Sequence, residues 1–348
     1  MGKLEMKSII VVSDVHLGHK RSNFEEFNEF LGWIRDAYRA PTEVVVTFEG
    51  KEKEITYPET IIFLGDILEL WEPKNDDFRY VGKQSKEFLE KIIDLPCEKI
   101  YVLGNHDKSL EEFSSHEYDL SSGNFEIFYK HFPENAKAEY LTIGKERYFF
   151  IHGHQFDKDM RYFKRLGEIG PSVLLSLQRI NKQLFRIWGF GSTILAVVLY
   201  CMHLYVFENV LLYAVAALFP FWGTNLAWRL GRPITRKLCK ARDIDIESIV
   251  ENGWYDPKED TIAAENLVFA HTHSPGIEKG ETLKKITEKN IKKELLVNTG
   301  SWFAKERITN TFLYIDEKEI LLLRWRKEIP EILISYDIGT NEIRYSKK

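Results

Sequence analysis

Asp and His residues follow short apolar runs of this sequence, and they are residue types that bind divalent metal ions. Asp14 and His16 form an Asp-x-His pair after residues 9–12. Because residues two apart in an extended segment point the same way, both side chains can reach one ion. Asp66 follows residues 61–64, and the two oxygens of a carboxylate can bridge two cations about 3.5–4 Å apart. This spacing predicts a site for two metal ions.

The other candidate ligands complete a shell of mixed nitrogen and oxygen atoms. Asn105 offers a neutral carbonyl oxygen and is followed directly by His106. His152, His271 and His273 add imidazole nitrogens. Such a set suits manganese, iron, zinc or cobalt better than magnesium. We therefore predict two divalent ions, with manganese as the first choice and iron, zinc or cobalt as alternatives.

The elements that must position these residues are short apolar segments. Residues 9–12, 61–64, 100–103, 148–151 and 267–270 are almost wholly apolar, as strands buried on both faces tend to be. Five such strands, each followed at once by metal-capable residues, predict a layered α/β core whose carboxyl-end loops carry the site. A single buried His or Asp is more often a hydrogen-bonded structural group. Seven of them at five strand ends favour a metal site.

Further elements are predicted around this core. Residues 24–38 and 84–93 have apolar residues at helical spacing. Residues 44–57 alternate in the manner of a β-hairpin. After Leu295, several β-branched runs predict a C-terminal contribution to the sheets.

The composition is that of a globular protein and argues against nonspecific nucleic-acid binding as its main role. With 348 residues and 44% hydrophobic residues, the chain can bury a large core in one domain or two unequal ones. The formal net charge of -5 lacks the basic excess of proteins that hold nucleic acid nonspecifically. Cys97, Cys201 and Cys239 lie far apart, which predicts neither a disulfide framework nor a thiolate zinc site and fits a reducing compartment.

The polar clusters together resemble the calcineurin-like metallophosphoesterases. The blocks of that family run D-x-H, G-D, G-N-H-D/E, H and G-H-x-H, and this sequence has SDVHLG, LGDILE, GNHD, IHGH and AHTH. The resemblance covers roughly residues 8–160 and 260–305, with Ala270 in place of the usual glycine. It implies an αββα metallophosphoesterase sandwich and a metal-dependent phosphohydrolase.

The resemblance also implies a role for each candidate. One metal would be held by Asp14, His16, Asp66 and His273, and the other by Asp66, Asn105, His152 and His271. His106 would stay unligated. An imidazole beside the metals can donate a proton to the leaving oxygen or stabilise charge on the phosphoryl group, while water activated by the two ions attacks phosphorus in line.

Four residues beside these blocks are candidates for contacting the substrate or orienting the ligands, namely Glu69, Trp71, Asp107 and His154. Surface solvation is an equally good interpretation of Glu69, Asp107 and His154. The stretch GDILELW resembles the G-D-x-x-E-x-W stretch of UDP-2,3-diacylglucosamine pyrophosphohydrolases, with Asp66, Glu69 and Trp71 at the matching positions. Those enzymes usually have Arg where this chain has His106.

An apolar segment interrupts the candidate ligands. Residues 187–207 and 210–228 are strongly apolar, and each is about as long as the ~20 residues with which a helix crosses a bilayer. Because the segment lies between His152 and His271, both of its ends must lie on one side, which a two-pass hairpin satisfies. Arg and Lys residues flank both ends, which predicts a catalytic domain on the cytoplasmic side of the cell membrane. The alternative is a helical cap buried against the catalytic domain or a dimer partner.

The sequence thus predicts a catalytic domain of residues 1–160 and 243–348 and a helical insertion of residues 161–242. The predicted function is two-metal hydrolysis of phosphate ester or pyrophosphate bonds on a lipid-linked or nucleotide-activated membrane substrate. One alternative is a membrane-tethered phosphodiesterase or phosphomonoesterase for a soluble substrate. Another is a non-catalytic scaffold with a phosphoesterase fold. No nucleic acid partner is expected, and the oligomeric state stays open.

Overall fold

The computed structural model describes residues 3–39, 44–71, 73–112, 117–120, 123–134, 139–154, 264–279, 295–304 and 306–346. The chain divides into two units, Met1–Phe156 with Asp243–Lys348, and Asp157–Arg242. All described residues belong to the first unit, so the predicted insertion at residues 161–242 and its apolar stretches lie outside them. Among the described residues, no helix combines the length and the apolar character needed to cross a membrane.

The first sheet holds nine strands of the described residues, in the order β18-β17-β16-β15-β2-β5-β6-β8-β7. Their bounds are β2 Ser8–Val12, β5 Thr60–Leu64, β6 Glu98–Val102, β7 Glu117–Leu120, β8 Gly123–Phe128, β15 Thr311–Asp316, β16 Glu319–Arg326, β17 Ile329–Asp337 and β18 Glu342–Tyr345. β2, β5, β6 and β8 are parallel, whereas β15 is antiparallel to β2. The carboxyl ends of β2, β5 and β6 therefore meet at one edge.

The second sheet has seven strands within the part of the chain that the structure describes. Its order is β1-β10-β11-β12-β14-β13, and β9 pairs with β11. The bounds are β1 Lys3–Met6, β9 His131–Phe132, β10 Tyr140–Ile143, β11 Glu146–Ile151, β12 Asn266–Phe269, β13 Gly276–Lys279 and β14 Leu295–Asn298. Because β11, β12 and β14 are parallel, their carboxyl ends also meet at one edge. β3 (Val44–Phe48) and β4 (Lys51–Ile55) form the predicted hairpin as a separate two-stranded sheet.

The uninterrupted apolar runs arise because the central strands are buried on both faces. In β2, Ile10 and Val12 belong to the core under the helices, whereas Ile9 and Val11 belong to the core between the sheets. Successive side chains of a strand point to opposite faces, so a strand with two apolar cores cannot alternate with polar residues. The strands predicted from such runs are all present as β2, β5, β6, β11 and β12.

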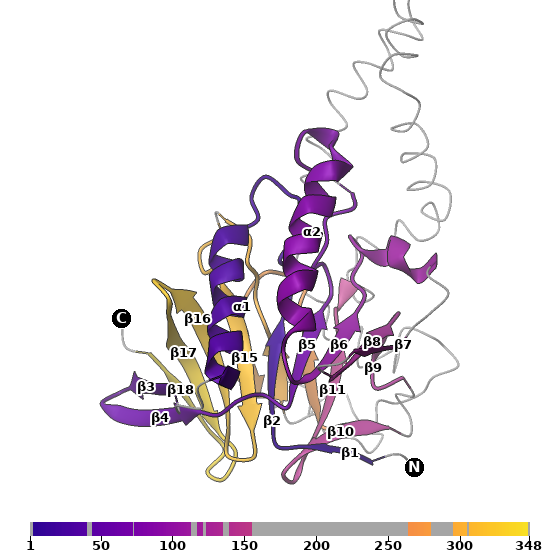
Figure 1. The fold of residues 1–348 in the computed structure, drawn as a ribbon. Coiled ribbons are helices and arrows are strands. Elements are labelled where there is room, and N and C mark those ends of the chain that lie inside the picture. The colour runs from indigo at the N-terminus through magenta and orange to yellow at the C-terminus, as the bar shows by residue number, and fades with distance from the viewer. Residues whose placement is uncertain are drawn as a thin grey trace, which may run out of the picture. The chain divides into compact units, whose positions relative to one another are not determined.

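One helical layer covers the outer face of the nine-stranded sheet (Figure 1). It consists of α1 (Phe24–Arg39) and α2 (Phe78–Ile93). A short 3₁₀ turn at Lys74–Asp76 precedes α2, and another at Lys108–Glu112 follows β6. The layers predicted by the αββα interpretation are thus present in part. The described residues contain this helical layer and two packed sheets, and none of their helices covers the other face of the seven-stranded sheet.

The second helix starts earlier than its apolar spacing predicts. α2 begins at Phe78 rather than at Gln84, because the Asp77 side chain accepts a hydrogen bond from the Arg79 backbone N–H and caps the helix. Phe78 at the start of the first turn is exposed, and Val81 is the one buried apolar residue of α2 before Gln84, so apolar spacing marks this end of the helix weakly. The buried Gln84 also faces inward, where its Oε1 accepts from the Gly18 N–H at 2.5 Å. α2 therefore supports the loop that follows His16.

Candidate metal centre

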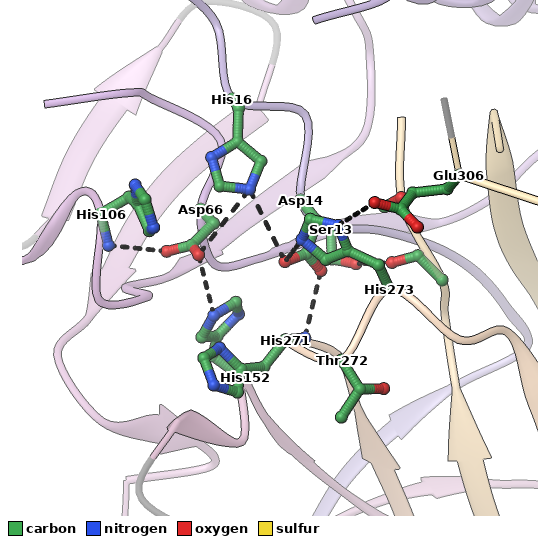
Figure 2. Close-up of polar contacts among 12 residues, drawn as sticks. Ser13, Asp14, His16, Asp66, His106, His152, His271, Thr272, His273 and Glu306 are labelled. Carbon is green, nitrogen blue, oxygen red and sulfur yellow. Dashed lines mark hydrogen bonds and ion pairs between the residues drawn. The ribbon is translucent and has the colours of Figure 1, made fainter. Parts of the chain in front are cut away.

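The residues predicted to bind metal lie together where β2, β5, β6, β11 and β12 end (Figure 2). A first group contains Asp14, His16 and His273, whose ligand atoms all lie within 4.8 Å of one another. His273 Nε2 lies 3.2 Å and His16 Nε2 lies 4.0 Å from Asp14 Oδ1. Ligands from the first and the last of the five loops thus face one another.

A second group contains Asp66, His152 and His271, again within 4.8 Å. His152 Nε2 lies 3.2 Å from Asp66 Oδ2, and His16 Nε2 of the first group lies 3.9 Å from the same oxygen. The Asp66 carboxylate therefore stands between the two groups, where a bridging ligand would be required. Asn105, also predicted as a ligand, is buried, and the backbone N–H of the next residue, His106, donates to Asp66 Oδ1 at 2.8 Å.

The ligand loops adopt an unusual backbone conformation. Positive φ angles of 48° to 69° occur at Asp14, His16, Asp66, His271 and His273. Residues other than glycine rarely adopt this left-handed backbone conformation, although Asp and His do so more often than most. Hydrogen bonds hold it here, since Asp14 N–H donates to Gly65 O at 3.0 Å and His16 N–H donates to Asp66 O at 2.9 Å. The first and second ligand loops are thereby fixed to each other.

Two glycines of the motifs are required by this packing. A Cβ atom at Gly65 would lie 2.3 Å from His152 Nδ1, and a Cβ atom at Gly104 would lie 2.2 Å from Asp66 Oδ1. Neither distance is compatible with a side chain. The glycines before Asp66 and Asn105 therefore let the loops approach the ligands closely.

Several buried polar atoms indicate that cations fit this site. Within the described residues, Asp14 Oδ1, His16 Nε2, Asn105 Oδ1 and His152 Nε2 are buried without a hydrogen-bond partner. A buried polar atom without a partner costs about 1–3 kcal/mol. Asp14 Oδ1 lies 4.0 Å from His16 Nε2 and 3.2 Å from His273 Nε2. Asp66 Oδ2 lies 3.9 Å from His16 Nε2 and 3.2 Å from His152 Nε2. Oxygen and nitrogen atoms that converge in this way are suited to divalent metal ions.

One carboxylate joins the metal site to His106. Glu69 Oε2 lies 3.1 Å from His16 Nδ1, and Glu69 Oε1 lies 2.8 Å from His106 Nδ1. The Trp71 N–H donates to Glu69 Oε1 at 2.9 Å, and the Trp71 ring stacks on the His106 ring with centroids 4.6 Å apart. The His106 N–H also donates to Asp66 Oδ1 at 2.8 Å. His106 is therefore held in place from three sides.

The electrostatics keep the carboxylates ionised. Burial disfavours the charge on Asp66, but the neighbouring His152 and His106 imidazoles outweigh it and hold the pKa of Asp66 well below its usual range. Burial also opposes protonation of His106, yet Asp66 and Glu69 raise the pKa of His106 to about 9. An ionised carboxylate is the form that binds a metal ion.

Comparison with known proteins assigns the family. A model of the calcineurin-like phosphoesterases matches residues 7–275, which is most of the chain. This chain belongs to the calcineurin-like phosphoesterase family. The resemblance in the sequence blocks is thereby confirmed, and the phosphoesterase is a metal-dependent phosphohydrolase. The family implies a binuclear centre of divalent metal, and the two ligand groups described above are candidates for it. His16, Glu69 and His106 form a third group in the described residues that could hold a metal ion.

Two individual proteins are similar to the phosphoesterase. An uncharacterized protein of Methanocaldococcus jannaschii is 26% identical over 189 residues, which cover 51% of this chain and 86% of that protein. Among solved structures, a dimetal phosphatase from Danio rerio aligns with 94% of this chain and 98% of its own, at 10% identity and a TM-score of 0.36. A likeness at that level says nothing of the function.

The remaining predicted candidates lie at different distances from the ligand groups. Asp107 accepts hydrogen bonds from Ile67 N–H at 2.9 Å, from Tyr101 Oη–H at 2.8 Å and from Gly104 N–H at 2.6 Å. It therefore ties the loop after β6 to the loop after β5. The His154 ring lies 5.5 Å from the His152 ring between centroids, next to the second group but outside it.

Sequence reasoning missed residues that follow a sixth strand. The Phe303 ring lies 5.1 Å from His16 and 5.5 Å from His273 between centroids. Glu306 Oε1 lies 3.9 Å from His273 Nδ1. Both follow β14, which ends at Asn298 in the polar run Asn-Thr-Gly-Ser. The signal used at five strands, an apolar run ending in polar residues, is present here as well and would have marked this loop.

Metal addition is expected to stabilise the phosphoesterase. At a free Mn²⁺ concentration 100 times its dissociation constant, binding to the folded state alone adds about 2.7 kcal/mol per site. For a domain of this size the thermal midpoint should then rise by roughly 5–10 °C per occupied site. Differential scanning fluorimetry of chelator-treated protein with and without Mn²⁺ measures the shift. An equal midpoint in both samples would contradict the metal fit of these residues, and Ca²⁺ is the matched control because it prefers an all-oxygen shell.

Proposed function

We propose that the phosphoesterase hydrolyses phosphate ester or pyrophosphate bonds with two divalent ions, manganese first among the candidates. The ligands assigned to the first ion are Asp14, His16, Asp66 and His273, and those assigned to the second are Asp66, Asn105, His152 and His271. The observation that supports this assignment most directly is the position of the Asp66 carboxylate, 3.9 Å from His16 Nε2 and 3.2 Å from His152 Nε2.

The reaction divides between the ions and the residues around them. When bound, two divalent ions supply Lewis acidity, which activates water for attack and offsets negative charge on the phosphoryl group. The chain supplies His106, whose Nδ1 is occupied by Glu69 Oε1 at 2.8 Å. Its Nε2 is thus the ring atom left to donate a proton to the leaving oxygen. The Trp71 ring, tilted by 31° against the imidazole, limits rotation of the His106 side chain.

Glu69 is proposed to serve two imidazoles at once, which a specific substitution tests. A carboxylate accepts from both His16 Nδ1–H and His106 Nδ1–H, whereas the amide in Glu69→Gln has one acceptor oxygen and one NH₂ donor. One imidazole then loses its partner. We expect turnover to fall by about 10–100-fold, the usual effect of removing a residue that orients metal ligands. Steady-state kinetics together with metal analysis measure the change.

The matched control for this substitution is Glu111→Gln in the 3₁₀ turn after the site, at Lys108–Glu112. Its activity should equal that of the unmodified chain. If Glu69→Gln retained full turnover, the carboxylate would be needed only for packing and the proposed coupling between the two imidazoles would be wrong.

The proposed substrate is lipid-linked or nucleotide-activated and is met at the cytoplasmic face of the cell membrane. Support comes from the sequence of residues 187–228, which are strongly apolar and interrupt the ligand set between His152 and His271. In this proposal the segment delivers the apolar end of the substrate to the metals. A membrane-tethered enzyme for a soluble phosphate ester is the alternative.

A substrate screen of the full chain tests both parts of the proposal. Purified protein is supplied with Mn²⁺ and offered an aryl phosphate diester, soluble nucleotides, and lipid pyrophosphates in detergent, with products identified by mass spectrometry. If the protein hydrolysed none of these substrates, the proposed hydrolysis of phosphate ester or pyrophosphate bonds would be overturned. Faster turnover of soluble nucleotides than of lipids would overturn the membrane substrate alone, as would an unchanged rate on membrane lipids after deletion of residues 187–228.

A further inference from the structure

A single residue separates ligands of the two proposed metal ions. Thr272 stands between His271, which belongs to the second ligand group, and His273, which belongs to the first. Both histidines have left-handed backbone conformations, with φ angles of 69° and 59°. Figure 2 shows the Thr272 side chain directed away from Asp14 and Asp66. Its hydroxyl is therefore not placed to act as a ligand.

The Thr272 hydroxyl is instead fixed by the neighbouring strand end. Asn298 Nδ2 donates to Thr272 Oγ1 at 2.7 Å, and Ser274 N–H donates to the same oxygen at 3.4 Å. The Thr272 N–H donates to Ala270 O at 2.8 Å. The Thr272 side chain therefore ties the His-Thr-His loop to the end of β14, beside a second contact in which the His271 N–H donates to Asp14 Oδ2 at 3.2 Å.

Asn298 is a rigid anchor for this contact. It is the last residue of β14, is buried, and pairs in register with Phe269 of β12. Its Oδ1 accepts from the Gly300 N–H at 2.8 Å, so the amide is oriented with Nδ2 toward Thr272. Both ends of the side-chain amide are used.

The same anchor is joined to the first ligand loop. Thr299 Oγ1 lies 2.5 Å from Ser13 Oγ, and the Trp302 N–H donates to Asp14 O at 3.1 Å. The residues after β14 therefore connect the loop of Asp14 with the loop of His271 and His273. A change at this anchor would be felt by ligands of both groups.

We propose that Thr272, held by Asn298, is a positioning residue that fixes His271 and His273 relative to each other and so sets the separation of the two metal ions. This inference rests on the proposed two-metal function. Without the hydroxyl contact, the loop between two left-handed residues is free to relax toward less strained conformations. Both ions should then bind more weakly, in contrast to the loss of one ligand, which removes one ion first.

The test compares two substitutions of similar size in the full chain. Thr272→Val removes the hydroxyl and keeps the shape, whereas Thr272→Ser keeps the hydroxyl. Chelator-treated protein is titrated with Co²⁺, followed by visible absorption and calorimetry. We expect Thr272→Val to weaken both binding events by about 10-fold or more, in the range known for residues that orient metal ligands, and Thr272→Ser to restore them to within about 3-fold.

Separation of the ions is read directly from the Mn²⁺-loaded protein. The magnetic coupling of two Mn²⁺ ions depends on their separation, so the electron paramagnetic resonance spectrum of Thr272→Val should differ from that of Thr272→Ser. Thr309→Val is the matched control, because Thr309 also uses its hydroxyl in nearby hydrogen bonds but lies outside the ligand loops. Its two affinities and its spectrum should equal those of the unmodified chain.

The outcomes separate this inference from the function on which it rests. If the unmodified chain binds two ions and Thr272→Val binds both with unchanged affinity and an unchanged spectrum, the positioning role is wrong and the two-metal function stands. Weaker binding of one ion alone, with the affinity for the other unchanged, would also overturn the inference. If the unmodified chain binds a single ion, the two-metal function itself is overturned.

Discussion

Asp66→Asn is expected to lose both metal ions and to lower turnover of an aryl phosphate diester by roughly 10³–10⁴-fold. Asp66 Oδ2 is close to ligands of both groups, so a neutral amide with a single acceptor oxygen weakens both sites together. Metal ions supply several kcal/mol of transition-state charge stabilisation, and each 1.36 kcal/mol is about tenfold in rate. The loss should therefore exceed that of any ligand that serves one ion.

Metal content and kinetics of the Asp66→Asn variant decide this prediction. Inductively coupled plasma mass spectrometry after dialysis gives the ions bound per chain. Asp77→Asn is the control, because Asp77 is an exposed helix cap and Asn caps a helix as well as Asp. Retention of two ions in Asp66→Asn at normal affinity would show that another residue bridges the groups.

His106→Gln is expected to lower kcat by about 10²–10⁴-fold while both metal ions stay bound, which is the usual contribution of a general acid. The His106 imidazole lies outside the proposed ligand set, and its Nδ1 contacts Glu69. The effect should be larger for an alkyl phosphate ester than for a nitrophenyl ester. A nitrophenolate leaves without a proton, so it has little need of an acid.

Rates on both ester types, with metal content measured in parallel, distinguish the roles of this histidine. Equal losses on both would assign His106 to charge stabilisation rather than proton donation. Loss of a metal ion would instead make it a ligand. His19→Gln is the matched control, because His19 packs on Phe303 at the edge of the site, with its Nδ1 accepting from Arg21 N–H. We expect its kcat to stay within about twofold.

The sequence predicted best those elements whose burial leaves a local pattern of apolar residues. β2, β5, β6, β11 and β12 could be predicted because each is buried on both faces and therefore has an uninterrupted apolar run. The short edge strand β13 lacks that run, because Glu278 and Lys279 are exposed and only Ile277 is buried. The start of α2 was missed for a related reason, since its first turn is set by the Asp77 cap and not by apolar spacing.

The contacts around the ligands could be predicted only in part. Glu69 and Trp71 were marked because they lie beside a motif, but nothing in the sequence says that one carboxylate reaches both His16 and His106. The contact of Asn298 with Thr272 joins two strand ends and depends on the pairing of β12 with β14. Such pairings follow from the packing of whole sheets. The membrane hairpin lies outside the described residues and stays a prediction.

The position of β15 has a consequence for how the protein is made. β2 carries the first ligand loop in the middle of its sheet, and its neighbour on one side is β15, where Tyr314 pairs with Ile10. At ribosomal rates of about 5–20 residues per second, the partner of Ile10 is synthesised roughly 15–60 s after it. Until then one edge of β2 is open, and His271 and His273 emerge only late in that interval. Metal loading is therefore expected only after the segment up to His273 has left the ribosome.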